Sequence, residues 1–201
     1  MQTKNTIKKL TQLAILTAVV IVFQMLGSFI HIGPTSVSLV LVPIVIGAIV
    51  LGPACGAFLG FVFGLITLIA GISGTDPFTN VLFTAQPFAT SAICILKATF
   101  AGLGAGWVYK AVSGKNKLVA SILAAASAPI INTGLFVLGG LFLVNKTLET
   151  NFVAGSGQTV VYFVIIGCAG LNFVAEFFVN LVVSPAINTI ANAIHGKISK
   201  K

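Results

Sequence analysis

One lysine lies in the middle of an otherwise apolar segment. Lys97 occupies the stretch TSAICILKATFAG, residues 90–102, which carries no other charged side chain. A lysine at the centre of a bilayer costs about 2.5–3.5 kcal/mol on insertion scales, so at that depth it normally has a partner or a function. Its ammonium group can pair with a carboxylate of the protein or with an anionic group of a bound ligand.

Two other apolar segments carry polar side chains at matching depth. In GLNFVAEFFVNLVVS, Asn172, Glu176 and Asn180 recur every four residues, so they share one face of a helix. Asn132 and Thr133 lie about halfway along a further segment, within APIINTGLF. Carboxylate, amide and hydroxyl groups at such positions are typical of a substrate path or a binding site.

The segment around Lys97 has polar neighbours of its own. Gln86, Thr90 and Lys97 lie on roughly one helix face once the bend expected at Pro87 is allowed for. The polar side chains on these three consecutive predicted helices thus predict a polar pocket, open to the exterior, that holds a small water-soluble ligand. The alternative is an ion pair between Lys97 and Glu176 that only ties helices together. The predicted ligand-binding residues are Gln86, Thr90, Lys97, Asn132, Thr133, Asn172 and Glu176, with loop contacts from His31, Asp76 and Asn80.

Catalytic arrangements are not indicated. Catalysis within a membrane needs a nucleophile with a base, a carboxylate pair or a metal cluster. Glu176 is the only acid within the apolar segments, and His31 and His195 lie near opposite ends of the predicted membrane spans. The three cysteines form no C-x-x-C pair, and no nucleotide-binding loop is present. We therefore predict that the protein is not an enzyme and uses no metal or cofactor, and that any active transport draws its energy from another subunit or an ion gradient.

The composition indicates an integral membrane protein. Hydrophobic residues make up 57% of the chain and charged residues only 7%, with a mean hydropathy of +1.11, against about 25% charged residues in an ordinary soluble domain. The net charge of +8 comes from lysines at the ends of apolar segments, without an arginine. Such lysines are typical of membrane topology signals, and we expect no nucleic-acid partner.

These apolar segments predict one all-α membrane domain over residues 1–201, a bundle of six transmembrane helices. The runs are long enough to cross a bilayer core about 30 Å thick, although the second is short. The basic N-terminus resembles a secretory signal, but no small-residue cleavage site follows, so we take it as the first membrane helix. The predicted spans are residues 10–30, 38–52, 54–72, 82–110, 118–144 and 158–190.

The lysines also predict the orientation. In a six-helix topology, Lys146 falls on one side and all other lysines outside the spans fall on the opposite side. Positively charged residues are retained in the cytoplasm, so both termini are predicted to be cytoplasmic. The long polar loops then face the exterior. The lysines on the cytoplasmic side are Lys4, Lys8, Lys9, Lys110, Lys115, Lys117, Lys197, Lys200 and Lys201.

Small residues recur at four-residue spacing in two neighbouring segments. The residues at this spacing are Gly52, Gly56, Gly60 and Gly64 in GPACGAFLGFVFG, and Ala98, Gly102 and Gly106 in ATFAGLGAG. Such residues let helix backbones approach closely, which matters in lipid because lipid tails are as apolar as the side chains. We predict close helix packing there.

Several of these stretches resemble a known family. They are LAILTAV near the start, HIGPTSVSLVLVPIVIGAIVLGPACGAFLGFVFGL, the loop DPFTNVLFTAQPF, and PIINTGLF. Together they resemble the substrate-binding S component of an energy-coupling factor (ECF) vitamin transporter, over residues 8–190. The stretches around GPACGAFLGFVFGL and NTGLF are most similar to the pantothenate branch of that family.

The resemblance implies a function and partners. An S component captures a vitamin from outside the cell, works with a membrane-embedded coupling subunit and two cytoplasmic ATPases, and topples in the membrane to release its substrate. It would lie in the bacterial plasma membrane as a multi-pass protein. In the family, the A-x-x-x-A face of the first helix contacts the coupling subunit, which corresponds here to Ala14 and Ala18. The vitamin pocket of the family is built from the outer loops and the fourth to sixth helices.

The resemblance leaves the ligand open. Pantothenate is favoured because its carboxylate could pair with Lys97, while its hydroxyl and amide groups contact Asn132, Gln86 and Asn172. Riboflavin, folate and pyridoxine-type vitamins are alternatives within the family. A stand-alone secondary transporter or channel, and a purely structural membrane protein, are alternatives outside it.

Overall fold

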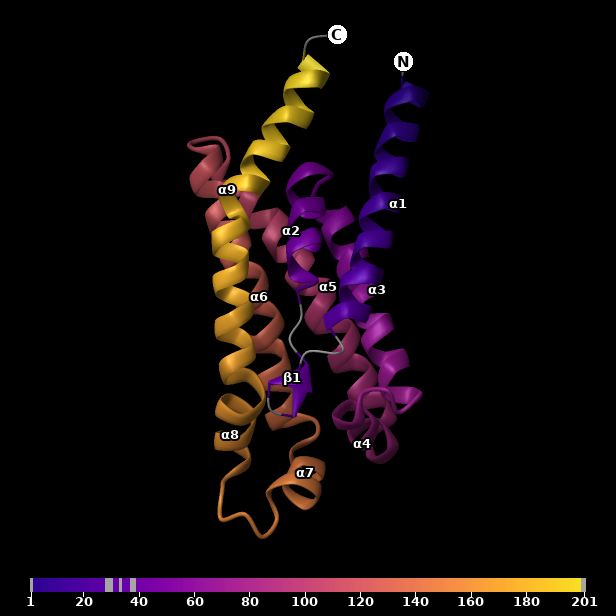
Figure 1. The fold of residues 1–201 in the computed structure, drawn as a ribbon, viewed down its shortest axis with the longest axis vertical. Helices are drawn as coiled ribbons and strands as arrows, with labels where there is room; N and C mark the ends of the chain where they lie inside the picture. Colours follow the sequence, from indigo (N-terminus) through magenta and orange to yellow (C-terminus); the bar gives the residue numbers. More distant parts are fainter. Residues whose placement is uncertain (1, 28–30, 33, 37–38, 200–201) are drawn as a thin grey trace.

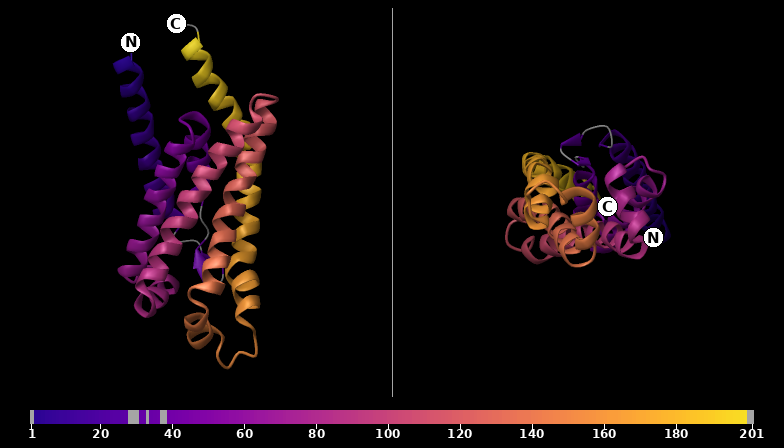
Figure 2. Two further views of the ribbon diagram at one scale, coloured as in Figure 1. Left: turned by 180° about the vertical axis from the view of Figure 1, so that it is seen from behind. Right: turned by 90° about the horizontal axis from the view of Figure 1, so that it is seen from below.

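A computed structural model describes residues 2–27, 31–32, 34–36 and 39–199. The chain forms an elongated bundle whose long helices run along its longest axis (Figure 1). α1 and α9 lie on opposite flanks, as the reverse view also shows (Figure 2). The long helices are α1 (Gln2–Gly27), α3 (Pro53–Ile72), α5 (Pro87–Val112), α6 (Lys117–Phe142) and α9 (Leu171–Ser199).

Five helical segments are long and apolar enough to cross a membrane: Thr6–Gly27, Pro53–Ile72, Pro87–Val112, Lys117–Phe142 and Val160–Ile187. The predicted span at 38–52 corresponds instead to α2 (Leu41–Val50), which has ten residues. Ten residues of α-helix are about 15 Å long, half the thickness of a bilayer core. The described part of the chain is thus mainly helical with five candidate membrane spans, and the count of six transmembrane helices stays a prediction.

A short antiparallel ribbon lies between α1 and α2 in the chain. β1 (His31–Ile32) pairs with β2 (Thr35–Ser36), with His31 opposite Ser36 and Ile32 opposite Thr35. The ribbon lies in the half of the bundle away from the chain ends, and α2 then leads back toward them (Figure 1).

Prolines and capping residues determine where several helices begin. α4 (Pro77–Ala85) starts at Pro77, and the Asp76 carboxylate accepts a hydrogen bond from the Thr79 backbone N–H at 3.3 Å. Pro87 is the first residue of α5, a position where its missing N–H costs no helical hydrogen bond. The predicted span at 82–110 is therefore divided: its first residues belong to α4, and the chain breaks at Gln86 rather than bending within one helix.

α3 and α5 pack backbone against backbone. A side-chain carbon built on Gly60 would collide with the Ala98 carbonyl of α5, and one on Gly56 would lie 2.6 Å from the Gly102 carbonyl oxygen. These contacts agree with the close packing expected from the four-residue spacing of small residues. Only glycine can stand at these positions, because the obstructing atoms are backbone atoms that cannot rotate away.

The half of the bundle away from the chain ends contains short and irregular helices. α7 (Asn145–Leu148) and the π-helix η1 (Glu149–Val153) follow α6. The predicted span at 158–190 begins with α8 (Val160–Tyr162), capped by Thr159, and continues through the π-helix η2 (Phe163–Gly170) into α9. Aromatic rings pack this region: Phe78, Phe136, Phe152 and Phe163 lie within 6.2 Å of at least one other ring centroid of the set.

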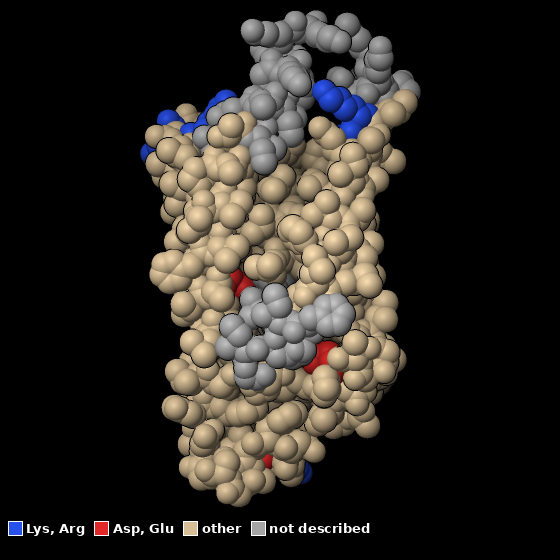
Figure 3. Space-filling view, in the orientation of Figure 1, with Lys and Arg blue, Asp and Glu red and all other residues tan. Residues whose placement is uncertain are grey.

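The charged residues divide along the bundle. Lysines lie at the end that carries the start of α1 and the end of α9, and between the two ends the face drawn in Figure 3 carries only small acidic patches. The described lysines at that end are Lys8, Lys9, Lys110, Lys115 and Lys117, whereas Lys146 lies in α7 at the other end. The structure thus places both termini at one end, while their cytoplasmic location stays a prediction.

Candidate functional site

A cavity lies among the helices in the half of the bundle remote from the lysine-rich end. It encloses about 80 Å³ for the centres of water-sized spheres, and a single water needs about 10–15 Å³ by the same measure. A smaller compartment of about 60 Å³ adjoins it and shares several of its lining residues. The polar lining residues of the main cavity are Gln24, Thr35, Thr67, Asp76, Thr79, Thr90, Lys97, Asn132 and Glu176.

α5 contributes a cation and a hydroxyl group to this cavity. Thr90, Cys94 and Lys97 follow one another at helical spacing on the lining face. The Thr90 hydroxyl is buried and donates to the Gln86 carbonyl at 2.9 Å, which leaves its lone pairs available to a ligand donor. The Lys97 Nζ atom lies 5.2 Å from the centroid of the Phe136 ring, a cation–π contact that holds the ammonium group at the cavity wall.

α6 contributes an amide with an unused acceptor. Asn132 is 5% exposed, and within the described part of the chain its Oδ1 atom has no hydrogen-bond partner. Buried polar atoms are almost always paired, so such an acceptor indicates a missing partner. Thr133, the next residue, lines only the adjoining compartment. Phe136 and Gly140 follow Asn132 at intervals of four and complete the α6 face of the main cavity.

α9 contributes Glu176 to both compartments and Asn172 to the smaller one. The Asn172 Nδ2 atom donates to the Thr35 Oγ1 atom, to the Thr35 carbonyl at 3.2 Å and to the Cys168 carbonyl at 3.1 Å. The Thr35 hydroxyl itself donates to the Cys168 carbonyl at 2.9 Å. Asn172 thus fastens the β-ribbon to the helix that carries Glu176. Lys97 and Glu176 line the same cavity. The ion pair predicted between them stays a prediction.

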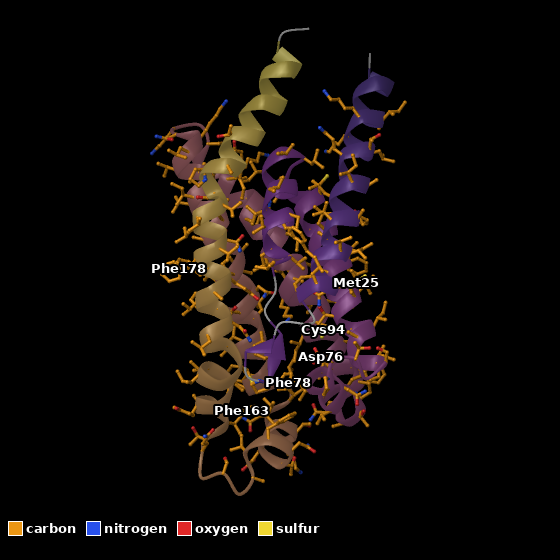
Figure 4. The ribbon with its side chains drawn as sticks, in the orientation of Figure 1. Met25, Asp76, Phe78, Cys94, Phe163 and Phe178 are labelled. Atoms are coloured by element: carbon orange, nitrogen blue, oxygen red, sulfur yellow. The ribbon has the colours of Figure 1, made fainter. Side chains whose placement is uncertain are left out.

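The predicted loop residues are used in different ways. Asp76 lines the main cavity, and its carboxylate accepts from the Thr79 hydroxyl at 2.8 Å. Figure 4 labels Asp76 with Phe78 and Cys94; Phe78 and Cys94 are buried, and Asp76 is half-buried. Asn80 instead donates to the Gly71 carbonyl at 2.8 Å, joining α4 to the end of α3. The side chain of the third predicted loop contact, His31, lies outside the described residues.

Gln86 does not belong to the lining of either compartment. Its Nε2 atom donates to the Thr147 hydroxyl at 3.1 Å, a bond that connects the α4–α5 junction to α7. The reason is local: the chain breaks at Gln86, so this residue is not on the regular face of α5 that carries Thr90 and Lys97. It therefore stabilises the outer wall of the cavity rather than facing its interior.

Several lining residues escape a reading of the sequence alone. Gln24 in α1 and Thr67 in α3 are buried polar residues within otherwise apolar runs, and that isolation is a signal that could have identified them. The Thr67 hydroxyl donates to the Phe63 carbonyl at 3.1 Å. The aromatic walls give no comparable signal, because phenylalanine is common throughout the chain. These walls are formed by Phe63, Phe78 and Phe136.

The two alanines predicted to contact a partner lie on the surface. Ala14 and Ala18 are both exposed on α1, and they occupy one face because they are four residues apart. α1 packs mainly against α3 and α2. The cavity opens in the other half of the bundle, so the alanine face and the cavity are separate features of the molecule.

The chemistry of the cavity suits a small ligand with mixed character. One ammonium group, the carboxyl groups of Asp76 and Glu176, amides and hydroxyls line it, while the remaining wall is mainly phenylalanine, leucine and isoleucine side chains. Such a site can pair an anionic group, donate and accept hydrogen bonds, and enclose an apolar part of the same ligand. Among the described residues, no group of three or more histidine, cysteine or acidic side chains could hold a metal ion.

Comparison with known proteins shows similarity to transporter proteins. The family model of the ECF transporter substrate-specific component matches residues 8–196. The chain is also 36% identical, over 143 residues, to the pantothenic acid transporter PanT of Lactococcus lactis subsp. cremoris (strain MG1363). That alignment covers 65% of this chain and 70% of the relative.

Proposed function

The chain belongs to the family of ECF transporter substrate-specific components, and from this premise we propose that it is the high-affinity vitamin-binding subunit of an ECF-type, ATP-driven importer, with pantothenate as its substrate. The observation that carries the proposal is the cavity that brings the Lys97 ammonium and the buried Asn132 amide oxygen together. The 36% identity to a pantothenic acid transporter favours this vitamin over others.

Pantothenate combines the groups that the cavity can satisfy. It has a carboxylate, an amide, hydroxyls and a pair of methyl groups on one carbon. We assign the carboxylate to Lys97, because a charge-assisted hydrogen bond is stronger than one between neutral groups. A donor of the ligand, N–H or O–H, would fill the open position at Asn132 Oδ1. The methyl groups would contact the phenylalanine side of the cavity.

The remaining polar residues have supporting roles in this proposal. The hydroxyls of Thr67 and Thr90 donate to their own helices and retain lone pairs for a ligand hydroxyl. Asn172 and Gln86 act through the wall: the first positions the ribbon, and the second connects α5 with α7. Glu176, Thr133 and Asp76 line the compartments and complete the set of side chains within reach of a bound vitamin.

The family also supports a proposal for the assembly. We propose that the ribbon and α2 together make the sixth crossing, so that both termini and the lysine-rich end are cytoplasmic and the cavity faces outward. The exposed Ala14 and Ala18 then offer a flat face to a membrane-embedded coupling subunit, which acts with two cytoplasmic ATPase subunits. The complex would lie in the plasma membrane of a bacterium.

The decisive experiment identifies the ligand. The detergent-solubilised full chain is denatured, and any released small molecule is identified by mass spectrometry. A separate, ligand-free sample of the folded protein is then titrated calorimetrically with pantothenate, riboflavin, folate and pyridoxine. We expect pantothenate in the released material and binding of pantothenate at submicromolar concentration. Binding of another vitamin alone would replace the substrate, and binding of none would remove the proposed pocket.

A second measurement separates this proposal from a stand-alone transporter. Uptake of radiolabelled pantothenate is measured in proteoliposomes that contain the chain alone or the chain with a coupling subunit and ATPases. We expect uptake only in the complete assembly with ATP inside the compartment that holds the ATPases. Uptake driven by an ion gradient through the chain alone would contradict the proposal.

A further inference from the structure

A groove runs along the outer surface of the bundle between α5 and α6, away from the cavity. It has a volume of about 540 Å³, and every lining residue is apolar or glycine. A second hollow of about 250 Å³ continues it and shares Leu135 and Leu138 with it. The residues that line the main groove are Phe100, Leu103, Gly104, Trp107, Ile130, Ile131, Gly134, Leu135 and Leu138.

The groove is open at Gly134 because this residue has no side chain. A side-chain carbon added at Gly134 would meet no atom within 4 Å, so this residue borders open space. Gly104 lies across from Ile131, whose Cδ1 atom occupies the place of the missing side chain. The exposed rings of Phe100 and Trp107 rise from α5 beside this floor. In a bilayer, such a hollow is filled by lipid chains, because an empty one would forfeit dispersion contacts along its whole length.

One end of the groove is positively charged. Lys110 follows Trp107 by three residues, so it continues the same ridge of α5 about 4.5 Å farther along the axis. Lys115 lies in the turn after α5, and Lys117 is the first residue of α6. All three lysines are exposed. A tryptophan followed by lysines is the pattern expected where a helix passes from hydrocarbon into the headgroup layer.

We propose that this groove is a binding site for one anionic phospholipid. An acyl chain lies over Gly134 and Gly104, and the phosphate is held by Lys110 and Lys117 at the lysine-rich end. The apolar lining explains the chain, and the charge at one end explains the selection of an anionic headgroup over a zwitterionic one. The main groove shares no lining residue with the vitamin cavity, whereas the adjoining hollow shares Ile93 and Lys97 with it. The lipid site therefore consists of the main groove alone and does not depend on which substrate the protein binds.

Native mass spectrometry of the detergent-solubilised full chain tests this proposal. The protein is titrated with phosphatidylglycerol or with phosphatidylcholine of the same acyl composition. We expect one phosphatidylglycerol molecule to bind at a concentration at least about tenfold lower than phosphatidylcholine requires, because each lysine near the headgroup contributes about fivefold. Equal affinity for the two lipids would overturn the proposal.

Two pairs of variants locate the site. Gly134→Phe fills the groove, and we expect it to weaken phosphatidylglycerol binding about tenfold or more. Its matched control, Val182→Phe, adds the same ring at a strongly exposed position of α9 and should bind the lipid as the parent does. Lys110→Ser with Lys117→Ser should lower the affinity for phosphatidylglycerol by about fivefold per lysine and leave phosphatidylcholine binding unchanged.

The control for charge removes two lysines from the same end of the bundle. Lys8→Ser with Lys9→Ser changes α1, which does not line the groove. We expect this variant to lose less than half as much free energy of phosphatidylglycerol binding as the variant with Lys110→Ser and Lys117→Ser. Thermal unfolding confirms that each variant is folded. Parent-like lipid binding in Gly134→Phe, equal effects of the two lysine pairs, or a dimer of the chain that forms in place of the lipid adduct would each overturn the proposal.

Discussion

The two halves of this bundle pack their helices in opposite ways. From the lysine-rich end to the level of Gly60 and Ala98, α3 and α5 approach until backbone touches backbone. The neighbouring core is built largely from alanine, including Ala105, Ala124 and Ala128. At the other half, phenylalanine rings, short helices and π-helical turns hold the same long helices around a cavity.

This difference teaches where the stability and the function of the protein are located. Close contact of small residues maximises dispersion contacts and leaves no space for a ligand. Large rings and irregular helices leave space, and one buried acceptor that faces this space, Asn132 Oδ1, has no hydrogen-bond partner within the described part of the chain. The compact half therefore acts as the platform, and the open half can bind a ligand without carrying the main burden of stability.

The largest effect is expected where the compact half is disturbed. Gly60→Leu places a side chain against the Ala98 carbonyl, which belongs to a helix backbone and cannot rotate away. We expect the free energy of unfolding to fall by at least about 3 kcal/mol, the upper end of the usual cost of overpacking. Thermal unfolding in detergent measures it. Gly134→Leu is the control, because nothing lies within 4 Å of its added carbon, and comparable stability of the two variants would show that α3 and α5 can separate freely.

The next effect would separate the surface of the compact half from the cavity. Ala14→Trp or Ala18→Trp adds a large ring to an exposed face of α1, and we expect uptake by the complete transporter to be lost because close helix contact with the coupling subunit is obstructed. Vitamin binding by the solitary chain should stay within about twofold of the parent, since the cavity is remote. Val182→Trp, on an exposed face of α9, is the matched control. Normal uptake in both alanine variants would place the coupling subunit elsewhere.

Within the open half, Lys97 should matter most. Lys97→Met removes the ammonium group from the cavity, and we expect the vitamin to bind about 30-fold to several thousandfold more weakly, because losing one partner of a buried charged hydrogen bond costs about 2–5 kcal/mol. Titration calorimetry measures this affinity.

A double variant then distinguishes a ligand contact from a structural role. Lys97→Met with Glu176→Leu removes both charges, so a purely structural ion pair would be replaced without loss of stability. We expect the double variant to unfold at a temperature close to that of the parent and still to bind weakly. Parent-like affinity in the double variant would leave Lys97 a structural residue and would exclude a carboxylate anchored there.

The smallest effect concerns the ring beside Lys97. Phe136→Leu removes the cation–π contact, which is worth about 0.5–2 kcal/mol depending on how well the pair is desolvated. We expect the affinity for the vitamin to fall by about threefold to tenfold with little change in stability. Phe178→Leu is the control, because Phe178 points away from the bundle on α9 (Figure 4) and is strongly exposed. Equal affinities in the two variants would mean that the ring does not hold the ammonium group.

Much of the fold follows from patterns that are local in the sequence. The lengths of the apolar runs predict α1, α3 and α6 to within a few residues at most ends, apart from the earlier start of α1. Proline at residue 87 was the main difficulty, because its fixed backbone angle permits either a bend in a helix or a new helix start. The structure decides for a new start, and Gln86 consequently bonds to Thr147 rather than facing the cavity.

The candidate site likewise contains residues that the sequence singles out and residues that only the structure reveals. Lys97, Asn132 and Glu176 line the cavity as the sequence indicates, because a polar group in an apolar segment has few other stable positions. Gln24 and Thr67 were not selected, although they are buried and face the same space. Their helices carry one such residue each in this region, so no repeating pattern marks a polar face.

The sequence alone determined that this protein is helical and apolar enough to lie in a membrane, which lysines lie at the ends of its apolar segments, and which family it resembles, since these properties depend on composition and on spacing within single segments. Only the tertiary structure decided which polar faces meet around one cavity and that an apolar groove remains between α5 and α6. Helical periodicity fixes which residues share a face, but the rotation of each helix about its own axis is set by its neighbours. Here, the contact of Gly60 with the Ala98 backbone sets the rotation of α3 against α5 and thereby directs Thr67 and Lys97 toward the same space.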